Sequence, residues 1–199
     1  MIYQKKLVIV LIIFINFISI SFSNSIEPDV FVQSTVNRAS KLLSENIGKD
    51  EKIEKLKLIA KETVDIRGIG LYTLGSARKS LTEEEKSIYA IRFEKYFLKS
   101  FSSRLAEYTN PEINVFAKKI LNKNYTIVNS TLKATSERPA IKIDWRIYTK
   151  NPDQPLIRDL IIEGLSLVRT QKEEFASVLS SNNGDINALF KILEEFSNK

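Results

Sequence analysis

The sequence predicts an α+β fold: N-terminal helices and a long amphipathic helix pack on a twisted antiparallel sheet of about four to five strands, and C-terminal helices follow. Three observations lead to this prediction. Apolar residues recur with a helical period in residues 28–108 and again after residue 165. Between these stretches the period changes to two, as in strands. The candidate strands are separated by short turn signals, which favours antiparallel neighbours.

Two amphipathic helices are expected first in the chain. One covers residues 28–45 and begins at Pro28, a residue type favoured in the first helical turn. Gly48 separates it from the other, which covers residues 52–64. Residues 65–75 hold three of the six glycines, so we expect an irregular segment there, with turns and close backbone approaches.

A long helix is expected from Thr82 to Tyr108. Thr82 and Glu85 have the spacing of a capping box, in which each side chain accepts a hydrogen bond from the other residue's backbone. Asn110 and Pro111 end the helix. Its large apolar residues are spaced by three or four positions and therefore share one face. They are Tyr89, Phe93, Phe97, Phe101, Leu105 and Tyr108.

Strands and two further helices are expected in the second half of the chain. Along residues 140–148, Ile141, Ile143, Trp145 and Ile147 alternate with polar residues. In the last strand, Ile157 and Ile161 occupy one face and Leu160 and Ile162 the other, so we expect a central strand covered on both sides. The expected strands are residues 113–120, 125–135, 140–148 and 156–163, and the helices are 165–179 and 185–196.

The composition excludes several classes of function. The chain has 199 residues, no cysteine and no histidine, so disulfides, thiolate or Ser-His-Asp catalysis and Cys or His metal sites are excluded. We expect no metal site and no cofactor. Thirty basic and 24 acidic residues give a net charge of +6, spread along the chain. This pattern is typical of a solvated basic surface, with anionic headgroups or acidic patches as the alternative partners.

Residues 1–23 have the layout of a secretory signal peptide. Lys5 and Lys6 precede an apolar stretch, and the small residues Ser21 and Ser23 precede a possible cleavage site. We expect a cleaved signal and a mature domain of residues 24–199, with an uncleaved membrane anchor as the alternative. Export argues against a nucleic-acid partner.

Three carboxylates keep an enzymatic alternative open. Asp159 and Glu163 lie four residues apart on a predicted strand, and Asp144 falls on the strand before it. Paired carboxylates support acid–base catalysis or glycoside hydrolysis. Salt bridges to Lys142, Arg146 or Arg158, or capping of the next helix, are the structural interpretation that we favour for them. The aromatic face of the long helix also has two interpretations. It either fills a core, or it borders an apolar cavity that lies against the sheet and holds an acyl chain.

The ordered motifs of the chain resemble the MlaC family of periplasmic phospholipid-binding proteins, also called toluene-tolerance auxiliary proteins. Asp159 to Val168 is similar to the family pattern of an aspartate, a strand and Glu-Gly-Val-Ser before a helix with an aromatic residue. Leu74-Gly75, the Thr82 helix start, the aromatic face and Asp144-Trp145-Arg146 resemble further family segments in the same order. Phe101 stands where the family commonly has tyrosine, and Leu165 where it usually has valine.

The resemblance implies a monomeric carrier without catalysis, located in the periplasm. Such a protein shields the acyl chains of a phospholipid and moves it between an MCE-domain subunit of an inner-membrane ABC transporter and an outer-membrane lipoprotein complex, which maintains outer-membrane lipid asymmetry. Other hypotheses are a carrier of another apolar lipid such as a hopanoid, a carboxylate-based envelope hydrolase, and a structural adaptor with a solid core. The cavity expected to bind lipid is lined by Phe93, Phe97, Phe101, Leu105, Trp145, Ile147, Ile161, Leu165 and Val168.

Overall fold

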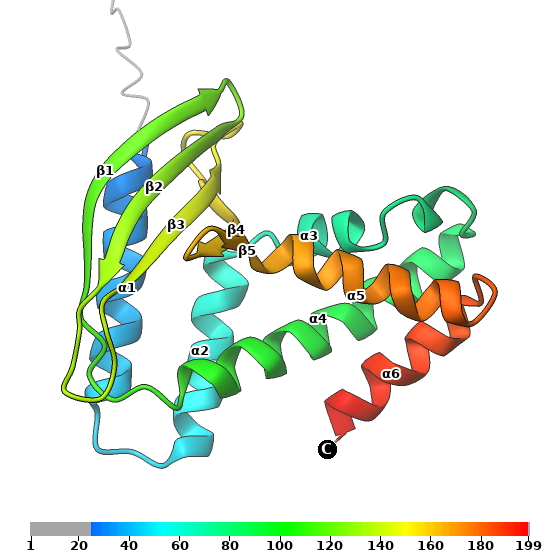
Figure 1. The fold of residues 1–199 in the computed structure, drawn as a ribbon, viewed down its shortest axis with the longest axis horizontal. Helices are drawn as coiled ribbons and strands as arrows, with labels where there is room; N and C mark the ends of the chain where they lie inside the picture. Colours follow the sequence, from blue (N-terminus) through cyan, green and yellow to red (C-terminus); the bar gives the residue numbers. More distant parts are fainter. Residues whose placement is uncertain (1–24, 199) are drawn as a thin grey trace, which may run out of the picture.

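The computed structural model describes residues 25–198. The predicted signal peptide, residues 1–23, lies outside this range. No helix within the described range is long and apolar enough to cross a membrane. The fold is α+β, as predicted, with a five-stranded sheet at one end of the molecule and helices extending away from it (Figure 1).

The sheet is an antiparallel meander in which every strand lies beside its sequence neighbours. Short turns join the first strands, as the turn signals predict, so each strand pairs with the one before it. The strands are β1 (Ile113–Asn122), β2 (Tyr125–Leu132), β3 (Ile141–Tyr148), β4 (Leu156–Ile162) and β5 (Leu165–Ser166).

Helix α1 (Pro28–Ser44) covers part of the inner face of this sheet, and α2 (Lys49–Thr63) lies on the same side. α1 packs against β1 and β2, and α2 lies beside α1 and also contacts α4 (Glu83–Leu105). Alternation along the strands supplies the apolar inner face, since Val128 and Ile147 are fully buried. The two N-terminal helices are confirmed close to their predicted bounds.

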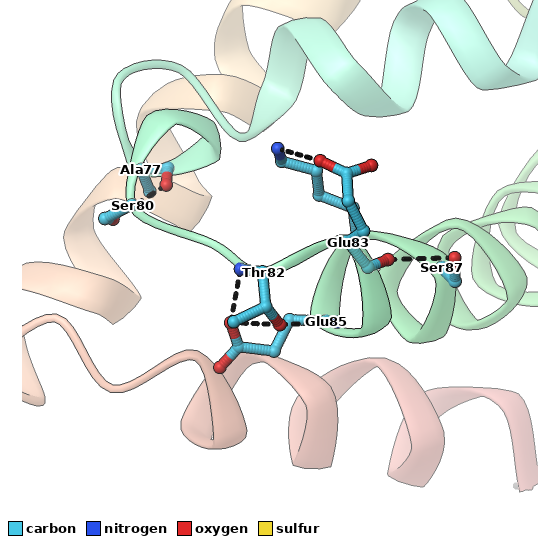
Figure 2. A network of polar contacts seen from close by, with 7 residues as sticks. Ala77, Ser80, Thr82, Glu83, Glu85 and Ser87 are labelled. Atoms are coloured by element: carbon cyan, nitrogen blue, oxygen red, sulfur yellow. Dashed lines mark hydrogen bonds and ion pairs between the residues drawn. The ribbon is translucent and has the colours of Figure 1, made fainter.

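The capping box at the start of α4 is confirmed (Figure 2). Thr82 Oγ1 accepts the Glu85 backbone N–H at 3.1 Å, and the Glu85 carboxylate accepts the Thr82 backbone N–H at 2.8 Å. Lys86 donates to the Glu83 carboxylate, and this hydrogen bond lowers the pKa of Glu83. The helix ends at Leu105 rather than at Tyr108, because residues 106–108 form a turn before the first strand.

The prediction of an irregular segment at residues 65–75 is wrong for most of its length. Residues Ile66–Thr73 form the helix α3, which Asp65 caps by accepting the Gly68 N–H at 2.8 Å. Gly70 serves helix packing, because a Cβ there would lie 2.8 Å from the Phe93 ring on α4. The left-handed turn falls at Gly75, with φ of 56°, and a 3₁₀ turn (Ala77–Lys79) follows.

The remaining helices build an aromatic core around α4. α5 (Leu167–Ser181) packs on α3 and β4, and α6 (Ile186–Asn198) packs on α4 and α5. The Phe93 and Phe175 rings meet edge to face, with centroids 6.2 Å apart. Tyr89 is almost fully buried and its hydroxyl bonds Thr73 Oγ1 at 2.8 Å. Burial raises the pKa of Tyr89 far above its usual value.

Strand β4 departs from simple alternation. Arg146 pairs with Asp159 and Ile147 with Ile157, so Arg158 is one extra residue on β4. After this bulge, Ile157 shares the inner face with Leu160 and Ile162, whereas Ile161 points to the outer face. Placing Ile157 and Ile161 on one face was therefore wrong. Both faces of β4 are covered, as expected, by α5 on one side and by the inner helices on the other, but only its end lies between two strands, because β5 has two residues.

Candidate apolar ligand site

An apolar cavity lies between the inner face of the sheet and the helices α1, α2 and the end of α4. Its volume is about 140 Å³. The sheet contributes Ile143 and Trp145 from β3, and Leu160 and Ile162 from β4. The bulge at Arg158 is what aligns these β4 residues with the β3 residues.

The sheet wall offers no free polar group to a ligand. The Trp145 indole N–H donates to Ser130 Oγ at 2.8 Å, and this hydroxyl donates to the Ile143 carbonyl at 3.0 Å. Both side chains are buried. The indole therefore presents only its apolar ring surface to the cavity, as buried tryptophans with a satisfied N–H do.

The helix wall is equally apolar. α1 contributes Val36 and Leu43, α2 contributes Leu56 and Ala60, and α4 contributes Phe101 and Leu105 among others. Three hydroxyl side chains also border the cavity, and each donates to a backbone carbonyl at 2.8–2.9 Å. They are Thr35, Ser40 and Thr63. Because these three hydroxyls are already hydrogen bonded, the helix wall suits an apolar ligand.

One end of the cavity opens to solvent beside Tyr108. Tyr108 is 39% exposed, whereas most of the lining is buried or half-buried. Pro111 and Ile113 of the adjoining chain, and Leu132 at the end of β2, border the same end. The exposed Tyr108 thus marks the mouth of the cavity, at the α4–β1 connection.

The sequence model of the MlaC protein matches residues 33–195 of this chain. The chain belongs to the MlaC family. A solved structure, that of a phospholipid-binding protein from Ralstonia solanacearum in complex with a phospholipid, has a similar fold, with a TM-score of 0.72. The two chains are 18% identical, and the match covers 87% of this chain and 98% of the other.

Three of the nine residues expected to line the cavity of this MlaC-family protein do so. They are Phe101, Leu105 and Trp145. Phe97 is half-buried behind Phe101, with the two rings stacked 5.6 Å apart. Phe93 and Ile147 are buried in the hydrophobic core and do not border the cavity. The helical face identified from the sequence therefore serves the core in its first half and the cavity in its second.

The other three expected residues lie away from the cavity. Ile161 faces outward because of the β4 bulge. Leu165 is 60% exposed on β5, and Val168 is half-buried at the start of α5 beneath the outer face of the sheet. Helices α1 and α2 also line the cavity, which their amphipathic patterns alone do not predict. Only the three-dimensional fold shows that these faces meet β3 and β4 across a space.

The three candidate carboxylates have structural partners in this MlaC-family fold. Asp159 is 3% exposed and accepts hydrogen bonds from Ser166 Oγ at 2.6 Å and from the Val168 N–H at 3.2 Å, at the start of α5. Asp144 accepts the Asn129 amide at 2.8 Å, and Glu163 accepts the Lys142 backbone N–H. Asp144 and Asp159 lie on the outer face, so the sheet separates them from the cavity.

The described residues form no metal centre. No group of three or more Asp and Glu side chains in residues 25–198 is arranged to hold a metal ion. The arrangement in this part of the chain therefore offers apolar enclosure, with hydrogen-bonded carboxylates on the opposite face of the sheet.

Proposed function

We propose that this protein is a periplasmic phospholipid carrier, which encloses acyl chain in the cavity between the sheet and helices α1, α2 and α4. The observation that carries the proposal is the apolar lining, in which every bordering hydroxyl of α1 and α2 is already hydrogen bonded. Membership of the MlaC family and the fold shared with a phospholipid-bound protein support the same conclusion.

The cavity volume indicates how loading proceeds. A methylene group is similar in size to a water molecule, about 30 Å³ in the liquid, so 140 Å³ holds about five methylene groups. Burial of about five methylenes at ~0.8 kcal/mol each gives ~4 kcal/mol, which corresponds to an affinity of only about 1 mM. Stable carriage of a whole chain therefore requires the cavity to widen when lipid enters. Pockets that enclose drug-sized small molecules have volumes of about 300–1,000 Å³, and a phospholipid acyl chain is of comparable size.

The cellular role follows from enclosure without chemistry. The carrier receives lipid from, or delivers it to, an MCE-domain subunit of an inner-membrane ABC transporter and an outer-membrane lipoprotein complex. A carrier alone moves lipid only down its gradient. The direction of net lipid transport therefore depends on how strongly the carrier, with and without lipid, binds each of the two partners. Residues 1–23 direct export and are removed, and the remaining domain acts as a monomer.

The test is native mass spectrometry of the protein exported to a bacterial periplasm and purified without detergent, followed by extraction of bound lipid. We expect a bound mass that matches phospholipid. Extraction of a hopanoid would instead support the alternative apolar ligand. A protein that is free of lipid as purified, and that also fails to take up lipid from phospholipid vesicles, would refute the carrier function.

A matched pair of variants tests the location of the ligand. Phe101→Glu places a charge in the cavity lining, whereas Leu165→Glu places the same charge on an exposed position outside it. We expect Phe101→Glu to lose bound lipid and Leu165→Glu to keep it, with circular dichroism confirming that both are folded. Leu105→Glu, nearer the mouth, replaces Phe101→Glu where that variant does not fold. Lipid retention by both cavity variants at the wild-type level would contradict this location.

The hydrolase alternative is tested separately. Alanine substitution of Asp144 and Glu163 removes two of the three carboxylates while leaving the buried cap Asp159 in place. We expect unchanged lipid uptake, because both side chains lie outside the cavity. Release of a hydrolysed lipid or glycan by the wild type, and its loss in this variant, would support the hydrolase instead.

A further inference from the structure

The mouth of the cavity carries an arginine with unused hydrogen-bonding capacity. Arg138 lies in the connection between β2 and β3, and its guanidinium stands over the Tyr108 ring, 5.2 Å from the ring centroid. Tyr108 is the exposed aromatic residue of the cavity lining. The guanidinium is therefore held at the mouth by a cation–π contact on one face.

One donor of this guanidinium is buried without a partner. Nη1 of Arg138 is shielded from solvent and donates no hydrogen bond, which is a costly state for a charged group. The one other side-chain nitrogen of this kind in residues 25–198 is Nε of Arg146, whose guanidinium lies 3.7 Å from the buried Asp159 carboxylate. Arg138 forms no ion pair with any carboxylate of the described chain.

Two acidic residues that flank Tyr108 in the sequence are already paired with other cations, and Glu137, next to Arg138, forms no ion pair with it. Glu112, just before β1, binds Lys133, and Glu107, just after α4, binds Lys49. Within residues 25–198 no carboxylate pairs with the Arg138 guanidinium, so it is available to an anionic ligand. Guanidinium groups match the geometry of phosphate oxygens and form two parallel hydrogen bonds with them.

We infer that Arg138 binds the phosphate of the lipid headgroup, so the site selects lipids that carry a phosphodiester next to the acyl chains over uncharged lipids with the same chains. This inference rests on the proposed carrier function and refines it. The acyl chain enters the cavity past Tyr108, and the phosphate remains at the mouth within reach of the guanidinium. Headgroup atoms beyond the phosphate extend into solvent, so the selection acts on the phosphate alone.

The experiment is a competition between two lipids that differ only in the headgroup. The purified protein is freed of its own lipid, incubated with equimolar dioleoylphosphatidylglycerol and dioleoylglycerol in non-ionic detergent micelles, and analysed by native mass spectrometry. We expect the wild type to prefer the phospholipid by about tenfold or more, the scale of a charge-assisted hydrogen-bonded pair. Arg138→Gln brings the ratio close to one, and Arg138→Lys gives an intermediate ratio.

Arg78→Gln is the matched control, since Arg78 is an exposed arginine on the 3₁₀ turn, away from the cavity lining. It keeps the wild-type ratio. A wild-type ratio near one, or an unchanged ratio in Arg138→Gln, would overturn the inference while leaving the carrier function intact. Failure of the wild type to bind either lipid would instead refute the carrier function itself.

A final arm separates a lipid headgroup from free phosphate. Inorganic phosphate at millimolar concentration is added to the lipid-free protein, and the melting temperature is recorded. We expect no shift in the wild type, because headgroup binding depends on the acyl chain held in the cavity. A shift that disappears in Arg138→Gln, together with no preference between the two lipids, would assign the site to free phosphate and overturn the headgroup inference.

Discussion

Filling the cavity should raise the stability of the protein and at the same time abolish its capacity for lipid. Ala60 on α2 is 1% exposed and borders the cavity, so a larger side chain at this position occupies the space that acyl chain would enter. Ala60→Leu adds three carbon groups, which take about 90 Å³ at about 30 Å³ each of the 140 Å³ present.

The expected gain in stability follows from the apolar surface buried. Three carbon groups at ~0.8 kcal/mol each raise the free energy of unfolding of the lipid-free protein by up to ~2.4 kcal/mol. For a domain of this size, each kcal/mol shifts the melting temperature by about 2–4 °C, so a rise of about 5–10 °C is the upper bound. Thermal unfolding measures this change, and native mass spectrometry measures bound phospholipid, which we expect to fall below detection.

Ala90→Leu is the matched control, because Ala90 is exposed on α4 and lies outside this cavity. The control should change the free energy of unfolding by less than about 0.5 kcal/mol and leave lipid binding unchanged. The reasoning is refuted if Ala60→Leu lowers the melting temperature, which would mean that the space is already filled and the new side chain is overpacked. Undiminished lipid binding in a stabilised Ala60→Leu variant would show that the ligand lies elsewhere.

Two further predictions concern the stability of the protein. Gly70→Ala should lower the free energy of unfolding by about 1–3 kcal/mol, because the new Cβ would lie 2.8 Å from the Phe93 ring and push α3 from α4; urea unfolding measures the loss. The melting temperature should be flat from about pH 5 to about pH 9, since the chain has no histidine or cysteine. The hydrogen bond from Lys118 lowers the pKa of Asp29, so the contribution of this pair to stability is lost on the acid side only as the pH falls below about 4. The same pair raises the pKa of Lys118, so on the alkaline side the contribution is lost only above about pH 10.

Controls separate these two predictions from general effects of substitution and solvent. Gly48→Ala is the control for Gly70→Ala, because a Cβ at Gly48 would meet no atom within 4 Å. An equal loss of stability in both variants would contradict the role assigned to the contact between α3 and α4. A step in the melting temperature centred near pH 6–7 would contradict the pH prediction, since each of the shifted pKa values in residues 25–198 moves away from that range.

The sequence is sufficient to predict most of the fold because local patterns determine it. The capping box of Thr82 and Glu85 sets the start of α4, and strict alternation sets the buried face of β3. Residues 65–75 were mispredicted because glycine there serves two purposes. At Gly75 it permits a left-handed turn, but at Gly70 it lets two helices approach closely within a regular helix.

The cavity was less predictable because it depends on contacts between distant elements. One bulged residue, Arg158, turns Ile161 outward and Leu160 inward, and no composition signal marks such an insertion. The contributions of α1 and α2 were missed for a different reason. An amphipathic face on a helix looks the same in the sequence whether it meets a filled core or an open space.

The long helix α4 illustrates how one regular pattern serves two different purposes. In its first half, Phe93 meets Phe175 and the backbone of Gly70, so this part of the helix is fixed by contacts on several sides. In its second half, Phe101 and Leu105 are half-buried and border the cavity, so they have neighbours on fewer sides. Displacing a side chain costs less free energy where that side chain makes fewer van der Waals contacts. The solid half can therefore hold the fold while the other half adjusts to an entering acyl chain, which is the mechanical requirement that the small cavity volume imposes on a lipid carrier.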